Sequence, residues 1–325
     1  MDDSKDRSAD AVSKSKFFIG ALSDDAGGVV FNNRVIVSNL LEQRTKVVFF
    51  NYSRKNVDIA DRNLVMVGLC RFVYGLAKEK PGAVWVHTSR LHRFILYYAV
   101  LLPFIFISGS RINVVLHSGR VNVGHISRLP LVEIYLLDHN VYERHMKMRN
   151  VHPFTSSFVS ELNQYLSRES KQLSEMSPRI AEIVRTRKYI LTTGYVNKTY
   201  NFNALIKAYL QDRSTDVALL ILSYGEITPG QYTKEFFKLV EAPGVIHIRD
   251  ISRCDYIGLL SNSLVLVRAT LWDSFGIAMY EAHYYNTPVV ASRVSNYRPG
   301  FAQLFDLRDL SATSLLQLID GASAA

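Results

Sequence analysis

Short apolar runs rich in β-branched and aromatic residues alternate with longer segments along most of this chain, and this alternation restricts the fold more than any other feature. A strand buried on both faces of a parallel sheet has such a continuous apolar run, and a crossover segment must join it to its parallel neighbour. The pattern therefore predicts an α/β architecture with parallel sheets. In the first half of the chain the predicted strands are residues 16–22, 46–52, 83–89, 112–119 and 131–140.

The segment 159–186 interrupts the alternation, because it is rich in serine and charge and has no strand pattern. It predicts helical linker material. A chain of 325 residues is also too long for one ordinary core and suits two domains of roughly 150 residues each. After the linker, further strands are predicted at 188–194, 217–225, 244–251, 264–270 and 287–293. We predict two Rossmann-like domains facing an interdomain cleft, divided into a disordered tail (1–15), an N-terminal domain (16–178, including the linker region 159–178) and a C-terminal domain (179–325).

Composition and charge exclude several classes of protein. Hydrophobic residues make up 48% of the chain, which excludes global disorder. Cys70 and Cys254 are too few for a disulfide framework, form no metal-ligand cluster, and are expected to be buried free thiols. No G-x-G-x-x-G sequence follows a predicted strand, which disfavours a nicotinamide-dependent enzyme. The net charge of +9 favours an anionic partner, but the Lys and Arg residues are dispersed, which disfavours nucleic acid.

We expect neither a signal peptide nor a transmembrane segment. Residues 1–15 are polar, carry charges of both signs and lack an apolar core. The longest apolar run, 94–108, is short for a membrane span and contains Pro103. Because its apolar residues lie almost all round a helix, segment 90–108 is expected to be a core helix between two parallel strands.

The stretch LWDSFGIAMYEAHYYNTPVVAS (271–292) holds two carboxylates eight positions apart, Asp273 and Glu281. A turn and the start of a helix lie between them, with Ser274 as the predicted N-cap and Gly276 letting a ligand approach the backbone. The free amides there and the helix dipole form an anion site suited to a diphosphate. An acid at each end with amides between them matches the polarity of a sugar nucleotide. The alternative is structural: Asp273 favours the helix dipole, and Glu281 is a solvated surface residue.

The sequence DSFGIAMYEAHYYNTPVVAS resembles the hallmark of the retaining glycosyltransferases of family 4 (glycosyl transferases group 1), which have the GT-B fold. That family has two glutamates separated by seven residues, Phe-Gly after the first, Glu-Ala at the second, and then Gly-Thr-Pro-Val-Val-Ala-Ser. Here Asp273 stands at the first glutamate, Glu281 at the second and Asn286 at the glycine. The resemblance implies a metal-independent, retaining, hexosyltransferase-like enzyme. It would move a sugar from a nucleotide-sugar donor to a glycan or lipid-linked acceptor in polysaccharide or glycoconjugate biosynthesis, with no cofactor beyond the donor.

The resemblance also implies roles for individual residues. Glu281 would bind the donor ribose, and Asp273 would hold hydroxyls of the donor sugar. His117 would face that sugar from the N-terminal, acceptor-side domain, the alternative being a structural histidine. Gly27 and Gly28 resemble the glycine loop that approaches the donor phosphates and the acceptor, the alternative being a plain turn. The other donor-binding residues, all in the C-terminal nucleotide-sugar-binding domain, would be Gly194, Lys198, Gly225, Arg249, Ser274, Phe275, Gly276 and Ile277.

Two positions depart from the family pattern. The family usually has an Arg just after the first strand of the C-terminal domain and a Lys about five residues later, both at the diphosphate; here these positions are Tyr195 and Tyr200. Charge stabilisation of a leaving group is usually a large catalytic effect. Either Lys198 and another cation, such as Arg249 or Arg298, substitute, or the activity is weak. The alternative function is therefore a catalytically weak or inactive GT-B-like binding or scaffold protein.

The resemblance further implies a membrane partner. The N-terminal domain of this family often contacts anionic membranes, where its acceptors reside, and a net charge of +9 would assist such contact. We predict a cytoplasmic protein with weak, salt-sensitive, peripheral binding at the cytoplasmic face of a membrane. Lys and Arg residues of the N-terminal domain would drive this binding, without insertion of helix 90–108. No nucleic-acid partner is expected.

Overall fold

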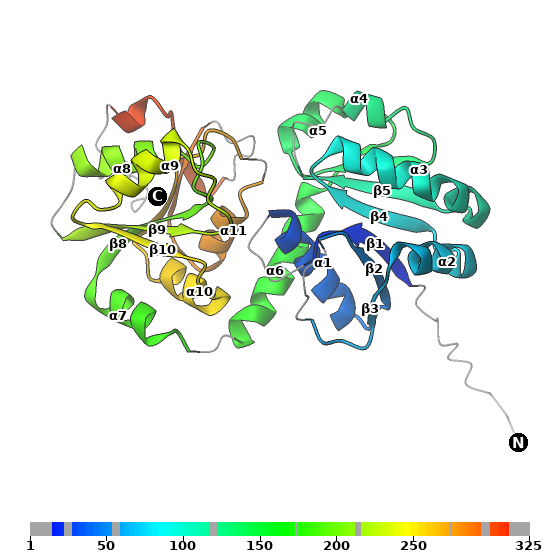
Figure 1. The fold of residues 1–325 in the computed structure, drawn as a ribbon, viewed down its shortest axis with the longest axis horizontal. Coiled ribbons are helices and arrows are strands. Elements are labelled where there is room, and N and C mark those ends of the chain that lie inside the picture. The colour runs from blue at the N-terminus through cyan, green and yellow to red at the C-terminus, as the bar shows by residue number, and fades with distance from the viewer. Residues whose placement is uncertain are drawn as a thin grey trace, which may run out of the picture. The chain divides into compact units, whose positions relative to one another are not determined.

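The computed structural model describes residues 15–22, 28–53, 59–117, 123–172, 175–211, 216–273, 275–293 and 300–311. Gly27, Ser274, Arg298 and almost all of the predicted tail lie outside these ranges. The chain divides into two compact units (Figure 1). The N-terminal unit comprises Met1–Leu116, Arg120–Tyr135 and Met148–His152, and the C-terminal unit comprises His117–Gly119, Leu136–Lys147 and Pro153–Ala325.

The first sheet has seven strands in the order β3-β2-β1-β4-β5-β6-β7. Strand β1 pairs in parallel with β2 and β4, and β4 pairs in parallel with β5. The strands are β1 (Lys16–Gly20), β2 (Val47–Asn51), β3 (Leu64–Met66), β4 (Ala83–Thr88), β5 (Arg111–Leu116), β6 (Val132–Leu136) and β7 (Val151–Pro153). The accompanying helices are α1 (Gly28–Glu42), α2 (Leu69–Glu79), α3 (Leu91–Ser108), α4 (Val123–Ile126) and α5 (His139–His145).

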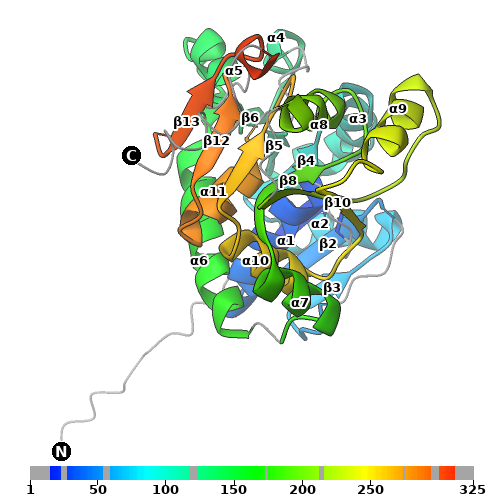
Figure 2. The same cartoon turned by 90° about the vertical axis from the view of Figure 1, so that its left-hand side faces the viewer.

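The second sheet has six strands in the order β10-β9-β8-β11-β12-β13, drawn from green to red in Figure 2. The strands are β8 (Lys188–Gly194), β9 (Val217–Ser223), β10 (Val245–Arg249), β11 (Val265–Arg268), β12 (Val289–Ser292) and β13 (Ala302–Phe305), all paired in parallel. The helices are α6 (Thr155–Gln172), α7 (Pro178–Thr186), α8 (Phe202–Gln211), α9 (Gln231–Leu239), α10 (Arg253–Ser261) and α11 (Ile277–Tyr284), with a 3-10 turn η1 (Asp309–Ser311). The strand order reverses between β8 and β11, as in doubly wound folds.

Successive residues along the central strands of the second sheet pack into two different hydrophobic cores, one on each face of the sheet. Ile190 and Leu219 lie in one hydrophobic cluster, while the next residues along the same strands, Leu191 and Leu220, lie in the other. All four side chains are 0% exposed. This follows from the two-residue period of a strand and explains why these strands appear as continuous apolar runs in the sequence.

The structure confirms the predicted parallel α/β architecture and places a strand in every predicted run. The predicted linker segment 159–186 contains most of α6 and all of α7. Three short strands, β3, β7 and β13, were not predicted. The expected burial of both cysteines is wrong: Cys70, in α2, is exposed, and Cys254 is half-buried.

Helix α3 corrects the prediction of a core helix over 90–108. One face is buried by Phe94, Tyr98, Leu101 and Ile105, but the other is open to solvent. Within the described residues, α3 is the one helix long and apolar enough to cross a membrane, judged by length and composition alone, and 22% of it is buried. The apolar run was expected to be too short for a span, but the helix begins at Leu91 and reaches 18 residues. An outer helix can cover a sheet with only one face, so apolar residues on its other face stay exposed.

Candidate functional site

The turn that precedes α11 is closed by Asp273. Its Oδ1 accepts a hydrogen bond from the Gly276 amide at 3.1 Å. Gly276 has φ 69° and ψ 51°, and a Cβ at this position would overlap the Met279 side chain, so the turn requires glycine. The predicted cap, Ser274, lies outside the described residues. Asp273 therefore stabilises the start of the helix, which was the structural alternative for this residue. The start of α11 remains suited to an anion.

Phe275 anchors this turn to the core of the C-terminal unit. Its side chain is 2% exposed, stacks on Tyr280 with ring centroids 4.6 Å apart, and meets the edge of Phe158 at 5.2 Å. The Phe275 ring is apolar and packs against two other aromatic rings, so it offers a ligand no hydrogen-bonding group. A donor-binding role of Phe275 can therefore come only from its backbone amide.

Arg268, the last residue of β11, was not predicted and is bonded to Asp273. Its Nη2 donates to Asp273 Oδ2 at 2.5 Å, and its Nη1 donates to the Thr193 carbonyl of β8 at 2.9 Å. Burial alone would lower the pKa of Arg268, but the Asp273 carboxylate opposes this and holds that pKa above its ordinary value. An arginine ending the apolar run LVLVR was the sequence signal that could have revealed this pair.

The two tyrosines at the expected cation positions pack directly over two predicted donor-binding glycines. A Cβ on Gly194, which has φ 156°, would overlap the ring of Tyr200, and one on Gly225 would lie 2.6 Å from the ring of Tyr195. The ring centroid of Tyr195 lies 5.6 Å from that of Tyr200 and 4.5 Å from that of Tyr224. The carboxyl ends of β8 and β9 therefore carry an aromatic cluster where the family pattern has positive charge.

Lys198 and Arg249 were predicted to substitute for the missing cations, and both are exposed. Lys198 is exposed in the loop after β8. Arg249 ends β10, and its Nη2 donates to the Gly225 carbonyl at 3.1 Å and lies 3.5 Å from Asp250 Oδ2. Asp250 in turn accepts from the Gly225 amide at 3.1 Å. Arg249 thus supports the Gly225 loop through its own side chain.

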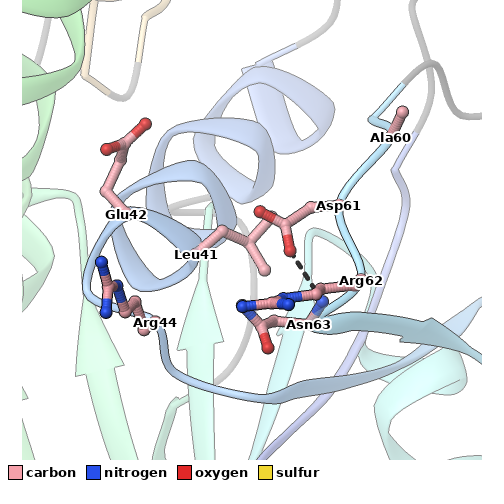
Figure 3. A pocket seen from close by; sticks show the side chains of 7 residues that line it. All are labelled: Leu41, Glu42, Arg44, Ala60, Asp61, Arg62 and Asn63. Carbon is pink, nitrogen blue, oxygen red and sulfur yellow. Dashed lines mark hydrogen bonds between the residues drawn. The ribbon is translucent and has the colours of Figure 1, made fainter.

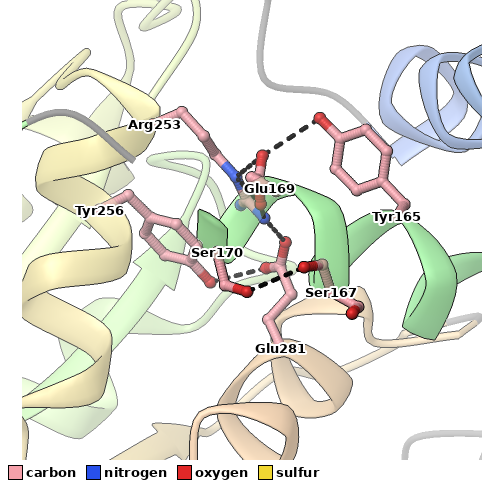
Figure 4. Close-up of polar contacts among 7 residues, drawn as sticks. All are labelled: Tyr165, Ser167, Glu169, Ser170, Arg253, Tyr256 and Glu281. Atoms are coloured by element: carbon pink, nitrogen blue, oxygen red, sulfur yellow. Dashed lines mark hydrogen bonds and ion pairs between the residues drawn. The ribbon is translucent and has the colours of Figure 1, made fainter. Parts of the chain in front are cut away.

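Glu281 is buried and contacts protein groups through both of its carboxylate oxygens (Figure 4). It is 3% exposed, so the alternative of a solvated surface residue is wrong. Its Oε2 accepts from the Tyr256 hydroxyl at 2.8 Å, and its Oε1 forms an ion pair with Arg253 Nη2 at 2.6 Å. A carboxylate offers about four acceptor positions, so hydroxyls of a ligand can still bind this one.

Arg253 joins Glu281 to helix α6. Its Nε and Nη2 donate to Glu169 at 3.0 and 2.8 Å, and Glu169 also accepts from the Tyr165 hydroxyl at 3.1 Å. Burial would lower the pKa of Arg253, but Glu281 and Glu169 raise it well above its ordinary value. Sequence reasoning missed this network, because its members lie on three helices with no spacing that connects them.

His117 directly follows β5 and is 7% exposed. Burial lowers its pKa from 6.5 to about 3, so the imidazole is neutral at physiological pH. Gly28 is the first residue of α1, and its partner Gly27 lies outside the described residues. Among the described residues, no three His, Cys, Asp or Glu side chains are grouped closely enough to hold a metal ion.

A separate pocket lies in the N-terminal unit, between the end of α1 and the start of β3 (Figure 3). Its lining residues are Leu41, Glu42, Arg44, Ala60, Asp61, Arg62 and Asn63. It lies at the amino ends of β2 and β3, whereas ligands of open α/β sheets bind at the carboxyl ends. None of the predicted site residues lines it.

The C-terminal part of the chain matches a known protein family by sequence. Residues 174–303 match the family Glycosyl transferases group 1. This range contains Arg268, Asp273 and Glu281. A search of curated proteins gave no match.

Solved structures share the fold over nearly the whole chain. A glycosyltransferase from Rickettsia africae is 10% identical, with a TM-score of 0.68 over 95% of this chain and 88% of that one. HepE from Anabaena, in complex with UDP-glucose, is 13% identical, with a TM-score of 0.65 over 94% and 90%. A UDP-forming α,α-trehalose-phosphate synthase from Burkholderia xenovorans is 15% identical, with a TM-score of 0.59 over 95% and 91%. The chain therefore has the predicted GT-B fold, and its residues 174–303 match the group 1 glycosyltransferases.

Proposed function

We propose that this protein is a retaining glycosyltransferase of family 4 that moves a sugar from a nucleotide-sugar donor to a glycan or lipid-linked acceptor. The observation that carries the proposal is the turn from Asp273 to Gly276 at the start of α11, joined through Arg268 to the carboxyl end of β8. Ligands of open α/β sheets bind where the strand order reverses, and a helix N-terminus favours a diphosphate. The family match over residues 174–303 covers this turn.

In this proposal the donor lies along α11. Its diphosphate meets the first helical amides, Asp273 accepts from hydroxyls of the donor sugar, and Glu281 accepts from the ribose. The helix dipole and a protein cation take the place of a metal ion in neutralising the leaving group. His117 faces the donor sugar as a neutral imidazole, because burial keeps its pKa at about 3.

A donor panel tests this function. Thermal unfolding is measured with UDP-, GDP-, ADP- and CMP-sugars, since a ligand that binds only the folded state at about a hundred times its Kd stabilises by about 2.7 kcal/mol. The stabilising donor is then incubated with glycan, lipid-linked and sugar-phosphate acceptors, and the anomeric configuration of the product is determined by NMR. Stabilisation and a product with the donor's configuration support the proposal. Stabilisation without turnover favours the inactive binding protein, and no stabilisation by any donor contradicts both.

Replacing His117 with Gln should remove a pH-dependent loss of stability. Because the pKa of His117 falls from 6.5 in the unfolded chain to about 3 in the folded protein, the unfolded state binds the extra proton between these values. Stability therefore falls as the pH falls through this window, by about 2 kcal/mol at pH 5. Urea unfolding of wild type and His117→Gln at pH 7.5 and 5 should show this difference in wild type alone.

The same variant separates the two roles given to His117. A donor-facing imidazole predicts that His117→Gln lowers turnover while the melting temperature at pH 7.5 stays nearly unchanged. A large loss of stability at pH 7.5 with turnover intact would instead identify a structural histidine. His125→Gln, a change on α4, is the matched control for both measurements.

We further propose peripheral contact of the N-terminal unit with an anionic membrane at the cytoplasmic face. The described residues of this unit contain 13 Lys and Arg against 4 Asp and Glu, whereas those of the C-terminal unit contain 17 against 16. The excess charge thus belongs to the unit that carries α3. The exposed face of α3, here called the α3 stripe, includes Ile95, Leu96, Phe106 and Ile107, exposed by 49%, 61%, 60% and 66%. Basic charge beside an exposed apolar helix suits an anionic lipid surface.

The exposure of the α3 stripe changes the expectation that helix 90–108 takes no part in membrane binding. Replacing both Leu96 and Phe106 with Ser should weaken vesicle binding several-fold, because it removes apolar area that enters the lipid interface. The measurement is co-sedimentation with vesicles with and without phosphatidylserine, at low and high salt. Phe237→Ser, which changes a phenylalanine of α9 that is 43% exposed, is the control and should bind like wild type. Equal binding of all three proteins would exclude the α3 stripe, and binding that ignores salt and lipid charge would exclude the electrostatic contribution.

A further inference from the structure

Arg268 occupies an unusual place in the C-terminal unit. It is 6% exposed and is the one buried Lys or Arg within the described ranges. It ends β11 and bonds to the Thr193 carbonyl of β8, so it bridges the two strands between which the sheet order reverses. Burying an unpaired charge is costly, and such a residue needs compensation from its surroundings.

The protein compensates this guanidinium only in part. An arginine has five N–H donors in a planar fork. The Thr193 carbonyl and Asp273 each accept from one terminal nitrogen, while the buried Nε has no hydrogen-bond partner among the described residues. The Tyr200 side chain also contacts the guanidinium: its ring centroid lies 5.4 Å from Cζ, and its hydroxyl accepts a hydrogen bond from Arg268. Donor capacity therefore remains unused at the carboxyl end of β11.

Arg268 and the start of α11 are joined through one side chain. Asp273 accepts from Arg268 with Oδ2 and from the Gly276 amide with Oδ1. An anion seated on the α11 amides thus lies beside the Asp273 carboxylate, which would repel it if it were unpaired. A cation bonded to that carboxylate removes this repulsion and adds its own attraction.

We propose that Arg268 supplies the positive charge that holds the diphosphate of the donor, in place of the cations absent at Tyr195 and Tyr200. This inference rests on the proposed function. The exposed alternatives suit the task less well, because Lys198 lies in the open and the Arg249 guanidinium is bonded to the Gly225 carbonyl. The cation would thus come from β11, beneath the aromatic cluster, and not from the loop after β8.

The test compares ligands that differ only in phosphate. Affinities of the full chain for a nucleoside, its monophosphate and its diphosphate are measured by calorimetry, using the base that the donor panel identifies. Because charge-assisted hydrogen bonds contribute about 1.5 to 3 kcal/mol, Arg268→Gln should weaken diphosphate binding about tenfold or more. Nucleoside binding should change less than about twofold by the same reasoning, and Arg268→Lys should fall between these limits. Arg308→Gln, which removes an arginine that is 93% exposed, is the control.

A double variant and melting temperatures distinguish a loss of diphosphate binding from a loss of folding, and the wild-type result tests the proposed function itself. Arg268→Gln combined with Asp273→Asn removes both charges of the buried pair, and melting temperatures identify any variant that fails to fold. A diphosphate-to-nucleoside preference that persists in the folded single or double variant overturns the role of Arg268 while leaving the proposed function intact. If wild type binds none of the diphosphates, the proposed function fails and this inference fails with it.

Discussion

Asp273→Asn is expected to lower turnover about a hundredfold while changing donor affinity little, because removing one preorganised polar group at a reacting centre costs about that much. The amide keeps an oxygen that can accept from Gly276, but it loses the charge that pairs with Arg268. Glu281→Gln should show the opposite pattern, with weaker donor binding and a smaller effect on turnover. The measurement is steady-state kinetics together with calorimetric donor affinity for both variants.

Two further variants serve as controls for Asp273→Asn and Glu281→Gln. Asp306→Asn makes the same chemical change at a half-exposed aspartate, whose Oδ1 lies 3.7 Å from Arg308 Nε, and should leave both quantities unchanged. Asp273→Glu introduces the glutamate that the family 4 pattern has at this position and lengthens the side chain by one methylene, so it should alter the choice of donor sugar more than it abolishes transfer. Wild-type affinity and turnover in both Asp273→Asn and Glu281→Gln would reject the assignment of the two acids.

The architecture could be predicted from the sequence because the central strands of both sheets are buried on both faces. Runs such as KYILTTG and VALLILS admit few interpretations, and each became a central strand. The exposure of individual side chains was harder to predict than the secondary structure. Helix α3 is apolar almost all round, and only the three-dimensional arrangement shows that Leu96 and Phe106 are 61% and 60% exposed.

At the candidate site, the sequence located the elements but not the partners of its side chains. The spacing of Asp273 and Glu281 placed both acids around the start of α11, as the structure has them. Their partners, Arg268, Arg253 and Tyr256, come from other elements, so no local pattern contained them. Buried ion pairs depend on tertiary contacts, and a single sequence does not reveal those contacts.

The departure from the family pattern at Tyr195 and Tyr200 has a consistent physical explanation. Glycine at positions 194 and 225 lets aromatic rings lie directly on the backbone at the ends of β8 and β9. Arg268 then lies beneath one of these rings. The aromatic rings at the ends of β8 and β9 and the buried arginine at the end of β11 therefore belong to one set of contacts.

Arg253→Met should reduce the free energy of unfolding by about 2 to 4 kcal/mol, since removing one partner of a buried ion pair leaves an uncompensated charge. Arg253 lies between two carboxylates, Glu169 and Glu281, whose side chains are 13% and 5% exposed. Methionine keeps most of the aliphatic volume, so the loss comes from charge more than from packing. The arginine side chain is itself 30% exposed, and solvent screening keeps the expected loss below the value for a fully buried triad.

Urea unfolding of four proteins measures this effect and its origin. Arg308→Met, a change at the surface, should cost less than about 0.5 kcal/mol. Arg253→Met combined with Glu169→Gln should recover part of the stability lost in Arg253→Met, because one of the two facing charges is gone. A loss in Arg253→Met no larger than in Arg308→Met would show that the network contributes nothing to stability. If the loss is large, donor affinity should fall with it, because Arg253 holds the carboxylate of Glu281 in place and joins α11 to α6.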